Sequence, residues 1–426
     1  MTRGDGRNDA VVLTGFGSVD ASGCGDEALA RTFQGPPRLS QLDTSAGYHR
    51  ADGSRHAALV DPACMAELLP ARQARRMSPP SRFAVVATRI AWQEAGLPFG
   101  EPETLQRLGE RTAVFTSTAY GPSSYTEELL RQILLGSPTQ ASPFLFTEAV
   151  ANAPAAQIAL ALKARGPNVT VTQREAGPLV ALAKAAQEIR SGRADRAVVA
   201  SVEEGNPLLH AVLDRFGVLA GSRGGAETAR PFDRERRGFV LAEGGAAWVL
   251  ESADAAARRG ARIYATLGPM IAGFDPSASP AGYGSGAELL ARRLRHGLER
   301  HGPGDGGAEW ADLDRVDTVV AGASGGRLGD ELEAGILRHL WPQKRPTILA
   351  PKAYTGEHGG GTLSGLAAVL KGLDAAPSPG FQNRDPDLDI EPFAGGTLRS
   401  SGRILVSAPA VGGSVAWLLV EPPGAG

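Results

Sequence analysis

Short, mainly apolar runs alternate with helix-period segments along almost the whole chain. Residues 11–16 and 112–116 are runs of the length that buried strands have. Residues 81–96 instead place their apolar side chains about one helical turn apart and end on Gly96, a residue type that commonly stops a helix. The alternation of the two patterns predicts an α/β fold with layers of helices and sheet, rather than separate all-α and all-β blocks.

The same patterns predict the remaining helices and strands. In the first half, helices are expected at residues 148–165 and 176–191, and strands at 168–172, 196–202 and 238–251. In the second half, helices are expected at 287–301, 329–341 and 361–375, and strands at 261–271, 317–321, 347–350, 403–407 and 414–420. Each half has a strand that runs into a loop of small residues, followed by a strand–turn–helix. We therefore expect two duplicated halves, residues 1–255 and 256–426, packed as one body.

Composition places the chain among ordinary globular proteins. Its 426 residues are 42% hydrophobic and 21% charged, and the formal net charge of −2 gives no electrostatic reason to expect a nucleic-acid or membrane partner. Residues 1–10 lack an apolar signal core, and no later run is long enough to span a bilayer. We expect a cytoplasmic protein in which Cys24 and Cys64 are free thiols, forming neither a disulfide framework nor a metal site.

The most informative segment is the predicted strand–turn–helix at residues 166–177. Such a turn usually presents the nucleophile of an acyl-transfer enzyme, because the helix N-terminus stabilises negative charge there. In this chain the turn carries Glu175, which has neither a thiol nor a hydroxyl. The segment thus has the form of a nucleophile site without the nucleophile.

Four blocks in order along the chain resemble the β-ketoacyl synthases of the thiolase superfamily. They are residues 75–78 (RRMS), 166–171 (GPNVTV), 231–246 (PFDRERRGFVLAEGGA) and 351–356 (PKAYTG). The resemblance runs over roughly residues 10–422, and several ordered blocks are more specific than any one of them. It implies a thiolase-like fold of two βαβαβαββ halves in α-β-α-β-α layers.

The resemblance also implies that three catalytic positions have been replaced. In that family a cysteine carries the acyl chain as a thioester, and two histidines support malonyl decarboxylation and stabilise the developing negative charge. The cysteine position falls on Glu175, and the two histidine positions fall on Gly322 and Glu357. An alternative role for Glu175 is that of a general base for malonyl decarboxylation, in which it would act without the histidine pair.

Two other family positions, Lys352 and Asp330, are retained. His358 follows the second histidine position by one residue and would fill it if the register were shifted. The spacing from Lys352 to Gly356 argues against that shift.

A β-ketoacyl synthase body without its reacting groups resembles the chain-length factor (KSβ) of type II polyketide synthases. The resemblance implies a heterodimer with an active ketosynthase (KSα), an acyl tunnel whose length sets the product, and a phosphopantetheinyl acyl carrier protein as partner, with no cofactor or metal of its own. Relatives that make aromatic polyketides commonly have Gln where this chain has Glu175, which favours another branch, such as the reducing systems that make polyenes. Two alternatives stay open: a malonyl-carrier decarboxylase or priming enzyme, and a carrier-binding scaffold.

Two segments, by the same resemblance, reach the dimer interface and line the partner's acyl tunnel. They are residues 120–125 and 142–146, and the candidate tunnel residues are Ser123, Ser124, Phe144 and Leu145. Ordinary interface packing is the alternative interpretation for each of these side chains. A third segment, residues 407–413, replaces the family's gating loop, with Val411 in place of the gating phenylalanine, followed by Gly412 and Gly413.

Overall fold

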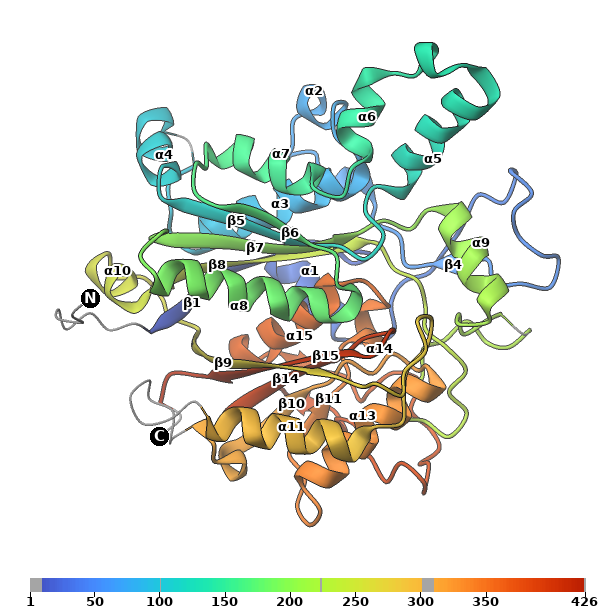
Figure 1. The fold of residues 1–426 in the computed structure, drawn as a ribbon, viewed down its shortest axis with the longest axis vertical. Helices are drawn as coiled ribbons and strands as arrows, with labels where there is room; N and C mark the ends of the chain where they lie inside the picture. Colours follow the sequence, from blue (N-terminus) through green and yellow to red (C-terminus); the bar gives the residue numbers. More distant parts are fainter. Residues whose placement is uncertain (1–9, 100, 223, 301–309, 425–426) are drawn as a thin grey trace.

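Two arrays of β-strands, joined edge to edge, form the centre of the molecule (Figure 1). The computed structural model describes residues 10–99, 101–222, 224–300 and 310–424. Within them the strand order is β11-β10-β14-β15-β9-β1-β8-β7-β5-β6, and β2 pairs with β1 at one side. The two arrays meet where β1 (Val11–Asp20) pairs with β9 (Ala265–Phe274) through Val12–Thr266 and Leu13–Ala265.

Each array repeats the topology of the other, which confirms the predicted thiolase-like duplication. In both, the three strands furthest from the join are parallel to one another and the strands nearest the join are antiparallel. The remaining strands of the first array are β5 (Thr112–Ser117), β6 (Asn168–Val171), β7 (Arg196–Glu203) and β8 (Gly244–Ser252). Those of the second are β10 (Val316–Val320), β11 (Thr347–Leu349), β14 (Arg403–Pro409) and β15 (Ser414–Glu421). The division of the chain at residue 255 stays a prediction.

Helices cover both outer faces of this pair of arrays and fill the space between them, giving α-β-α-β-α layers (Figure 1). The outer layer of the first array contains α3 (Pro79–Glu94) and α7 (Ala153–Leu162). The central layer contains α8 (Gly177–Arg190) and α15 (Gly360–Lys371), and the outer layer of the second array contains α11 (Ala287–Glu299) and α13 (Arg327–Leu340). The two central helices are rich in Ala, Gly and Leu because they pack against sheet on both sides.

Shorter elements connect these layers. The helices are α1 (Asp26–Thr32), α2 (Ala71–Ala74), α4 (Pro102–Gly109), α5 (Ser123–Arg131), α6 (Pro143–Ala149), α9 (Pro207–Phe216), α10 (Ala253–Arg258) and α14 (Lys352–Thr355). The strands are β2 (Gly23–Cys24), β3 (Ser40–Gln41), β4 (His56–Ala57), β12 (Asp374–Ala375) and β13 (Gly396–Thr397). Single helical turns of other types are η1 (Pro62–Met65), η2 (Gln132–Gly136), η3 (Pro138–Gln140), η4 (Arg174–Ala176) and η6 (Leu313–Arg315).

Several predicted elements differ from the structure. The strand expected at 261–271 begins only at Ala265 and continues to Phe274. The helix expected at 361–375 ends at Lys371, because Gly372 takes a left-handed conformation and residues 374–375 form β12. The helix expected at residues 148–165 is divided, because α6 ends at Ala149 and α7 begins at Ala153 with Pro154 in its first turn, where a missing N–H costs nothing. The strand expected at 238–251 begins only at Gly244, since residues 238–243 make isolated bridges to other segments. The last residue of the helix expected at 287–301 lies outside the described residues, as do residues 1–9.

A helix of membrane-spanning length and apolarity does not occur among the described residues. The pair α6 and α7, bent by 93°, meets the length and composition criteria only when its two helices are taken together.

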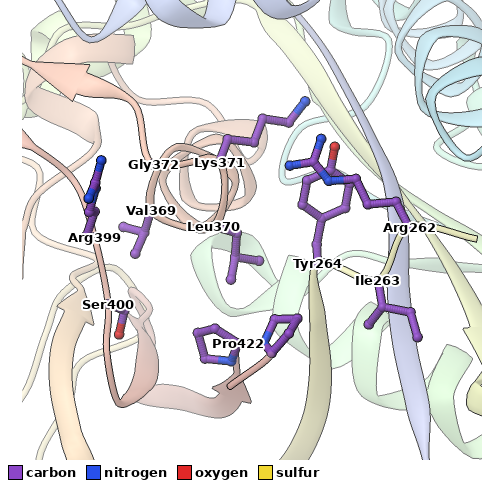
Figure 2. A pocket seen from close by; sticks show the side chains of 11 residues that line it. Arg262, Ile263, Tyr264, Val369, Leu370, Lys371, Gly372, Arg399, Ser400 and Pro422 are labelled. Carbon is purple, nitrogen blue, oxygen red and sulfur yellow. The ribbon is translucent and has the colours of Figure 1, made fainter. Parts of the chain in front are cut away.

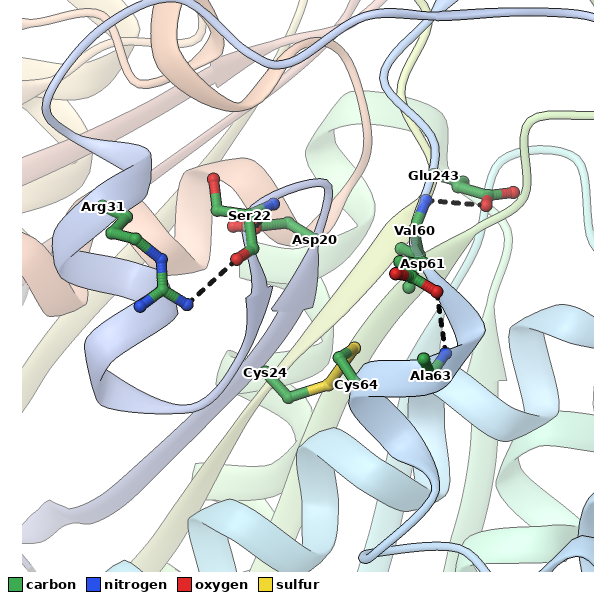
Figure 3. Close-up of a disulfide and its surroundings, with 9 residues drawn as sticks. All are labelled: Asp20, Ser22, Cys24, Arg31, Val60, Asp61, Ala63, Cys64 and Glu243. Atoms are coloured by element: carbon green, nitrogen blue, oxygen red, sulfur yellow. Dashed lines mark hydrogen bonds between the residues drawn. A yellow bond between two sulfur atoms is a disulfide. The ribbon is translucent and has the colours of Figure 1, made fainter.

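The two cysteines form a disulfide, which corrects the expectation of free thiols (Figure 3). The hairpin of β1 and β2 carries Cys24 to η1, where Cys64 lies with a Cα–Cα separation of 5.9 Å. The two residues are 40 positions apart in the sequence, so their proximity depends on the tertiary fold and has no signal in local spacing.

Candidate functional site

Glu175 lies at the predicted elbow between β6 and α8. The strand ends at Val171, the backbone reverses at Arg174 with φ 47°, and Glu175 sits in the single turn η4 that leads into α8. The turn is tight enough that a Cβ on Gly177 would lie 2.2 Å from the Ser117 hydroxyl oxygen. The half-buried carboxylate of Glu175 accepts a hydrogen bond from the Val411 N–H at 3.2 Å. The structure therefore brings the gating-loop segment to the former nucleophile position.

Glu357 forms a buried ion pair with Lys352 across the turn that follows β11. The Lys352 ammonium lies 2.8 Å from a Glu357 carboxylate oxygen, and only 4% and 16% of the two side chains are exposed. The turn between them needs Gly356, whose φ of 72° is unfavourable for other residues. The Glu357 N–H donates to the Val240 carbonyl at 2.7 Å, which fixes the backbone of the turn.

Charge interactions join this ion pair to Glu175. Burial raises the pKa of Glu357, the Lys352 ammonium lowers it, and the negative charge of Glu175 raises it further. Burial alone would lower the pKa of Lys352, but the carboxylates of Glu357 and Glu175 outweigh burial and raise it. The lysine is therefore held as an ammonium between acidic groups.

The position of Gly322 has no room for a side chain. Its N–H donates to the buried carboxylate of Glu333 at 2.9 Å. A Cβ built on Gly322 would lie 2.8 Å from Pro409 Cδ and 3.0 Å from the Ser407 carbonyl oxygen, distances at which a neighbour must move. Pro409 thus closes the space where a histidine side chain would have to begin.

Asp330 and Glu333 stand one turn apart on α13 and hold the loop that contains Gly322. The Asp330 carboxylate accepts from the backbone N–H groups of Ser324 (3.1 Å), Gly325 (3.2 Å) and Phe232 (2.8 Å). Burial raises the pKa of Asp330 to about 7 and also raises that of Glu333. The retained aspartate is therefore a loop-holding group in this structure.

Sequence reasoning missed two tyrosines near these carboxylates. Tyr283 packs on α13, since a Cβ at Gly329 would lie 3.0 Å from its ring. Burial raises the pKa of Tyr283 well above its ordinary value, with Glu175 and Glu357 adding to the effect. Burial likewise raises the pKa of Tyr120, and the negative charge of Glu175 is the next largest cause. Tyr283 belongs to none of the segments identified in the sequence, whereas Tyr120 begins the 120–125 segment but was not connected with these carboxylates. Glu333 was also missed, although its spacing of three from Asp330 on a predicted helix was a usable signal.

His358 does not fill the second histidine position. Glu357 holds that position and pairs with Lys352. Within the part of the chain that the structure describes, neither ring nitrogen of His358 has a hydrogen-bond partner. Burial lowers the pKa of His358 to about 4, and the Lys352 ammonium adds to this. The imidazole is therefore a neutral, packed side chain at pH 7.

The candidate tunnel residues lie on α5 and α6. Ser123 and Ser124 begin α5, and their hydroxyls donate to the buried Glu204 carboxylate at 2.6 and 2.8 Å, with the Ser124 N–H as a third donor. Phe144 is 40% exposed on α6 and has its ring 6.4 Å from that of Tyr125. Leu145 is half-buried. The serine hydroxyls are thus engaged by Glu204, whereas the Phe144 ring is partly exposed.

The gating-loop segment is a tight turn between β14 and β15. Gly412 and Gly413 both have positive φ, 89° and 91°, which explains the glycine pair. The Gly412 N–H donates to the Gly282 carbonyl at 3.0 Å, so the turn is tied to the segment that carries Tyr283.

A hollow of about 430 Å³ lies away from this site, at the other end of β9 (Figure 2). Tyr264 and Arg262 stand on one side and Arg399 on the other, with Leu370 and Pro422 between them. Lys371, on its wall, is held by ion pairs with Asp26 and Glu94.

Comparisons with known proteins agree with one another. The model of the "Beta-ketoacyl synthase, N-terminal domain" family matches residues 40–256. The chain is 30% identical over 341 residues to "3-oxoacyl-[acyl-carrier-protein] synthase 2" of Mycobacterium bovis, covering 75% of each chain. It is 29% identical to "Granaticin polyketide putative beta-ketoacyl synthase 1" of Streptomyces violaceoruber, covering 89% of this chain and 90% of that protein.

Solved structures with the same fold include a ketosynthase/chain-length-factor pair. "The ishigamide ketosynthase/chain length factor" matches with a TM-score of 0.82 and 25% identity, over 97% of this chain and 99% of that one. A type II polyketide synthase acyl-carrier protein in complex with its ketosynthase, AntDE:AntF, also matches with a TM-score of 0.82, at 22% identity and the same coverage. At 22% identity the second likeness concerns the fold alone.

Proposed function

The chain belongs to the beta-ketoacyl synthase family, and we propose that within it the chain serves as a non-condensing chain-length factor of a type II polyketide synthase. The observation that carries this proposal is the state of the three catalytic positions. Glu175 accepts a hydrogen bond from the loop, Gly322 is closed by Pro409, and Glu357 is committed to Lys352. Each position is occupied by a structural interaction as well as by the wrong residue type.

Condensation needs a nucleophile and donors aimed at the developing negative charge. A carboxylate at position 175 has no thiol with which to hold an acyl chain as a thioester. The Val411 N–H, which would be placed to donate to an acyl oxygen at that position, already donates to Glu175. Gly322 and Glu357 likewise supply no imidazole donor for an enolate at the two histidine positions, and the Lys352 ammonium is already paired with Glu357. These features favour a partner that performs the chemistry.

An active ketosynthase is the partner that we propose. The exposed edge of the first array is β6. Large apolar side chains are exposed on α7 and on residues 123–149, which we call the α5–α6 arm: Leu134 (75%), Leu135 (80%), Phe146 (61%) and Leu160 (72%). Permanent complexes bury on the order of 2,000 Å² or more of such surface. The matched ishigamide structure is itself a ketosynthase/chain-length-factor pair, which supports this assembly.

The proposed role in chain length rests on the α5–α6 arm. Phe144 and Leu145 would project toward the partner's acyl tunnel and limit its depth. Ser123 and Ser124 would act indirectly, since their hydroxyls keep α5 attached to Glu204. A phosphopantetheinyl acyl carrier protein would deliver the units to the partner's cysteine.

Co-expression with an active type II ketosynthase that has an intact cysteine and histidine pair tests the proposal. Size-exclusion chromatography should give a 1:1 complex, and the complex should make polyketide only when the partner's cysteine is intact. Incubation with malonyl-carrier substrate and intact-mass measurement should show no acyl adduct on this chain. Malonyl decarboxylation by the isolated chain would instead favour an enzyme that uses Glu175. Binding of carrier protein without any ketosynthase complex would favour a scaffold.

A further inference from the structure

We propose that arginines at both ends of β6 make this edge select a partner with acidic residues there and disfavour pairing with a second copy of itself. The inference rests on the proposed heterodimer and adds the chemistry by which the chain avoids a homodimer.

The β6 strand is the open edge of the first array. It pairs in parallel with β5 on one side, and no strand pairs with its other side among the described residues. Asn168 at its start is exposed, and Val169 and Thr170 are half-buried. Unpaired backbone groups on such an edge are a template for another strand, and proteins commonly control that risk with charged side chains.

Arg165 precedes the strand by three residues and Arg174 follows it by three. Both are exposed, and neither guanidinium lies within 4.0 Å of a carboxylate oxygen in the described part of the chain. Glu175, the neighbour of Arg174, is directed to the Val411 N–H instead. Arg174 also has a φ of 47°, a backbone conformation that residues other than glycine rarely adopt. Its charge is therefore displayed without an internal partner.

The surface beside β6 combines apolar and basic side chains. A shallow hollow of about 630 Å³ is lined by Ala156, Ala159 and Leu160 of α7, together with Lys163, Arg165 and Asn168. Leu160, one of these lining residues, is 72% exposed. An apolar centre with a polar border is the usual composition of a protein–protein interface, in which the border charges set the choice of partner.

In a two-fold symmetric homodimer these arginines would repel each other. In a homodimer built on antiparallel β6 strands, pairing about the strand's centre places Arg165 of one copy level with Arg174 of the other, and symmetry repeats the contact. Both contacts join like charges. A partner with acidic residues at the corresponding places converts both into attractions, and this repulsive element against the wrong partner supplies specificity.

Sedimentation equilibrium of the isolated chain, with and without Arg165→Gln/Arg174→Gln, tests the proposal. Both substitutions in this double variant keep a long polar side chain and remove only its charge. We expect the double variant to self-associate roughly tenfold more tightly than the wild type, the size that two exposed like-charge contacts give. The wild-type homodimer should strengthen between about 50 mM and about 500 mM NaCl, because salt screens the repulsion, and the double variant should not. Arg292→Gln on α11, an exposed arginine of the second half, is the matched control and should change nothing.

The same substitutions should have the opposite effect on the affinity of the heterodimer. With the ketosynthase partner used in the co-expression experiment, the double variant should bind several-fold more weakly and lose the salt sensitivity of the wild-type pair. A homodimer unaffected by the two substitutions, or a heterodimer unaffected by them, overturns the basic-edge inference while leaving the proposed function intact. Absence of any heterodimer with either form instead refutes the proposed function.

Discussion

Removing one member of the Lys352–Glu357 pair should destabilise the protein strongly. The two charged atoms are 2.8 Å apart and their side chains are 4% and 16% exposed, so Glu357→Gln leaves an ammonium in a site with little water. Breaking a buried pair in this way costs about 3–5 kcal/mol. The negative charges of Glu175 and Glu333 also act on Lys352 and offset part of the loss. We therefore expect a decrease of about 3 kcal/mol in the free energy of unfolding.

Urea unfolding followed by tryptophan fluorescence measures this decrease, and Lys352→Met/Glu357→Gln is the control. Removing both charges leaves neither uncompensated, so the double variant should lie within about 1.5 kcal/mol of the wild type. The pKa of Lys352 is raised above its ordinary value, so its stabilising charge is complete below that ordinary value and is lost only as the pH rises through the raised one. The difference between wild type and Glu357→Gln should thus shrink on the alkaline side, as the pH rises through the raised pKa of Lys352. Equal stability of Glu357→Gln and wild type would refute the view that this pair holds the site.

The remaining predictions concern the other altered positions. Glu175→Cys alone should not give a condensing enzyme, since both histidine positions remain altered; steady product formation by this variant in isolation would contradict the assignment of those positions. Gly322→His should lower the melting temperature, because its Cβ would meet Pro409 at 2.8 Å, and Gly322→His/Pro409→Gly should recover part of the loss; an unchanged melting temperature for the single variant would contradict the steric account. His358 has a pKa of about 4 in the folded protein, so between pH 6.5 and pH 4 the unfolded chain binds more protons than the folded one. The free energy of unfolding therefore decreases as the pH is lowered through this range, by up to about 3 kcal/mol. His358→Leu should remove that part of the acid sensitivity, as urea unfolding at pH 5 and pH 8 would reveal, whereas an unchanged difference between the two pH values would speak against it.

The strand and helix pattern could be predicted from the sequence because each element has a strong local period. The break between α6 and α7 was not anticipated, since the apolar period continues across it and only Pro154 marks the new start. Glu175, Gly322 and Glu357 were identifiable because motif spacing survives when the reacting residue is replaced. Tyr283 and the Cys24–Cys64 disulfide were not, because each depends on contacts between segments far apart in the chain.

The candidate tunnel residues show a further limit of sequence reasoning. Placement on the α5–α6 arm followed from the resemblance, but the direction of each side chain did not. The hydroxyls of Ser123 and Ser124 bond to the buried Glu204, so a bulky substitution there would disturb the start of α5 as well as any tunnel. Phe144, exposed and free of such bonds, is the better probe.

The product length of the reconstituted pair tests the central claim most directly. Mass spectrometry of the polyketide made with Phe144→Trp should show shorter chains, and with Phe144→Ala longer ones, because the ring volume at this position would set the depth of the partner's tunnel. Phe216→Ala on α9, another exposed phenylalanine, serves as control and should leave the length unchanged. A length distribution identical for Trp, Phe and Ala at position 144, in an intact heterodimer, would contradict the account.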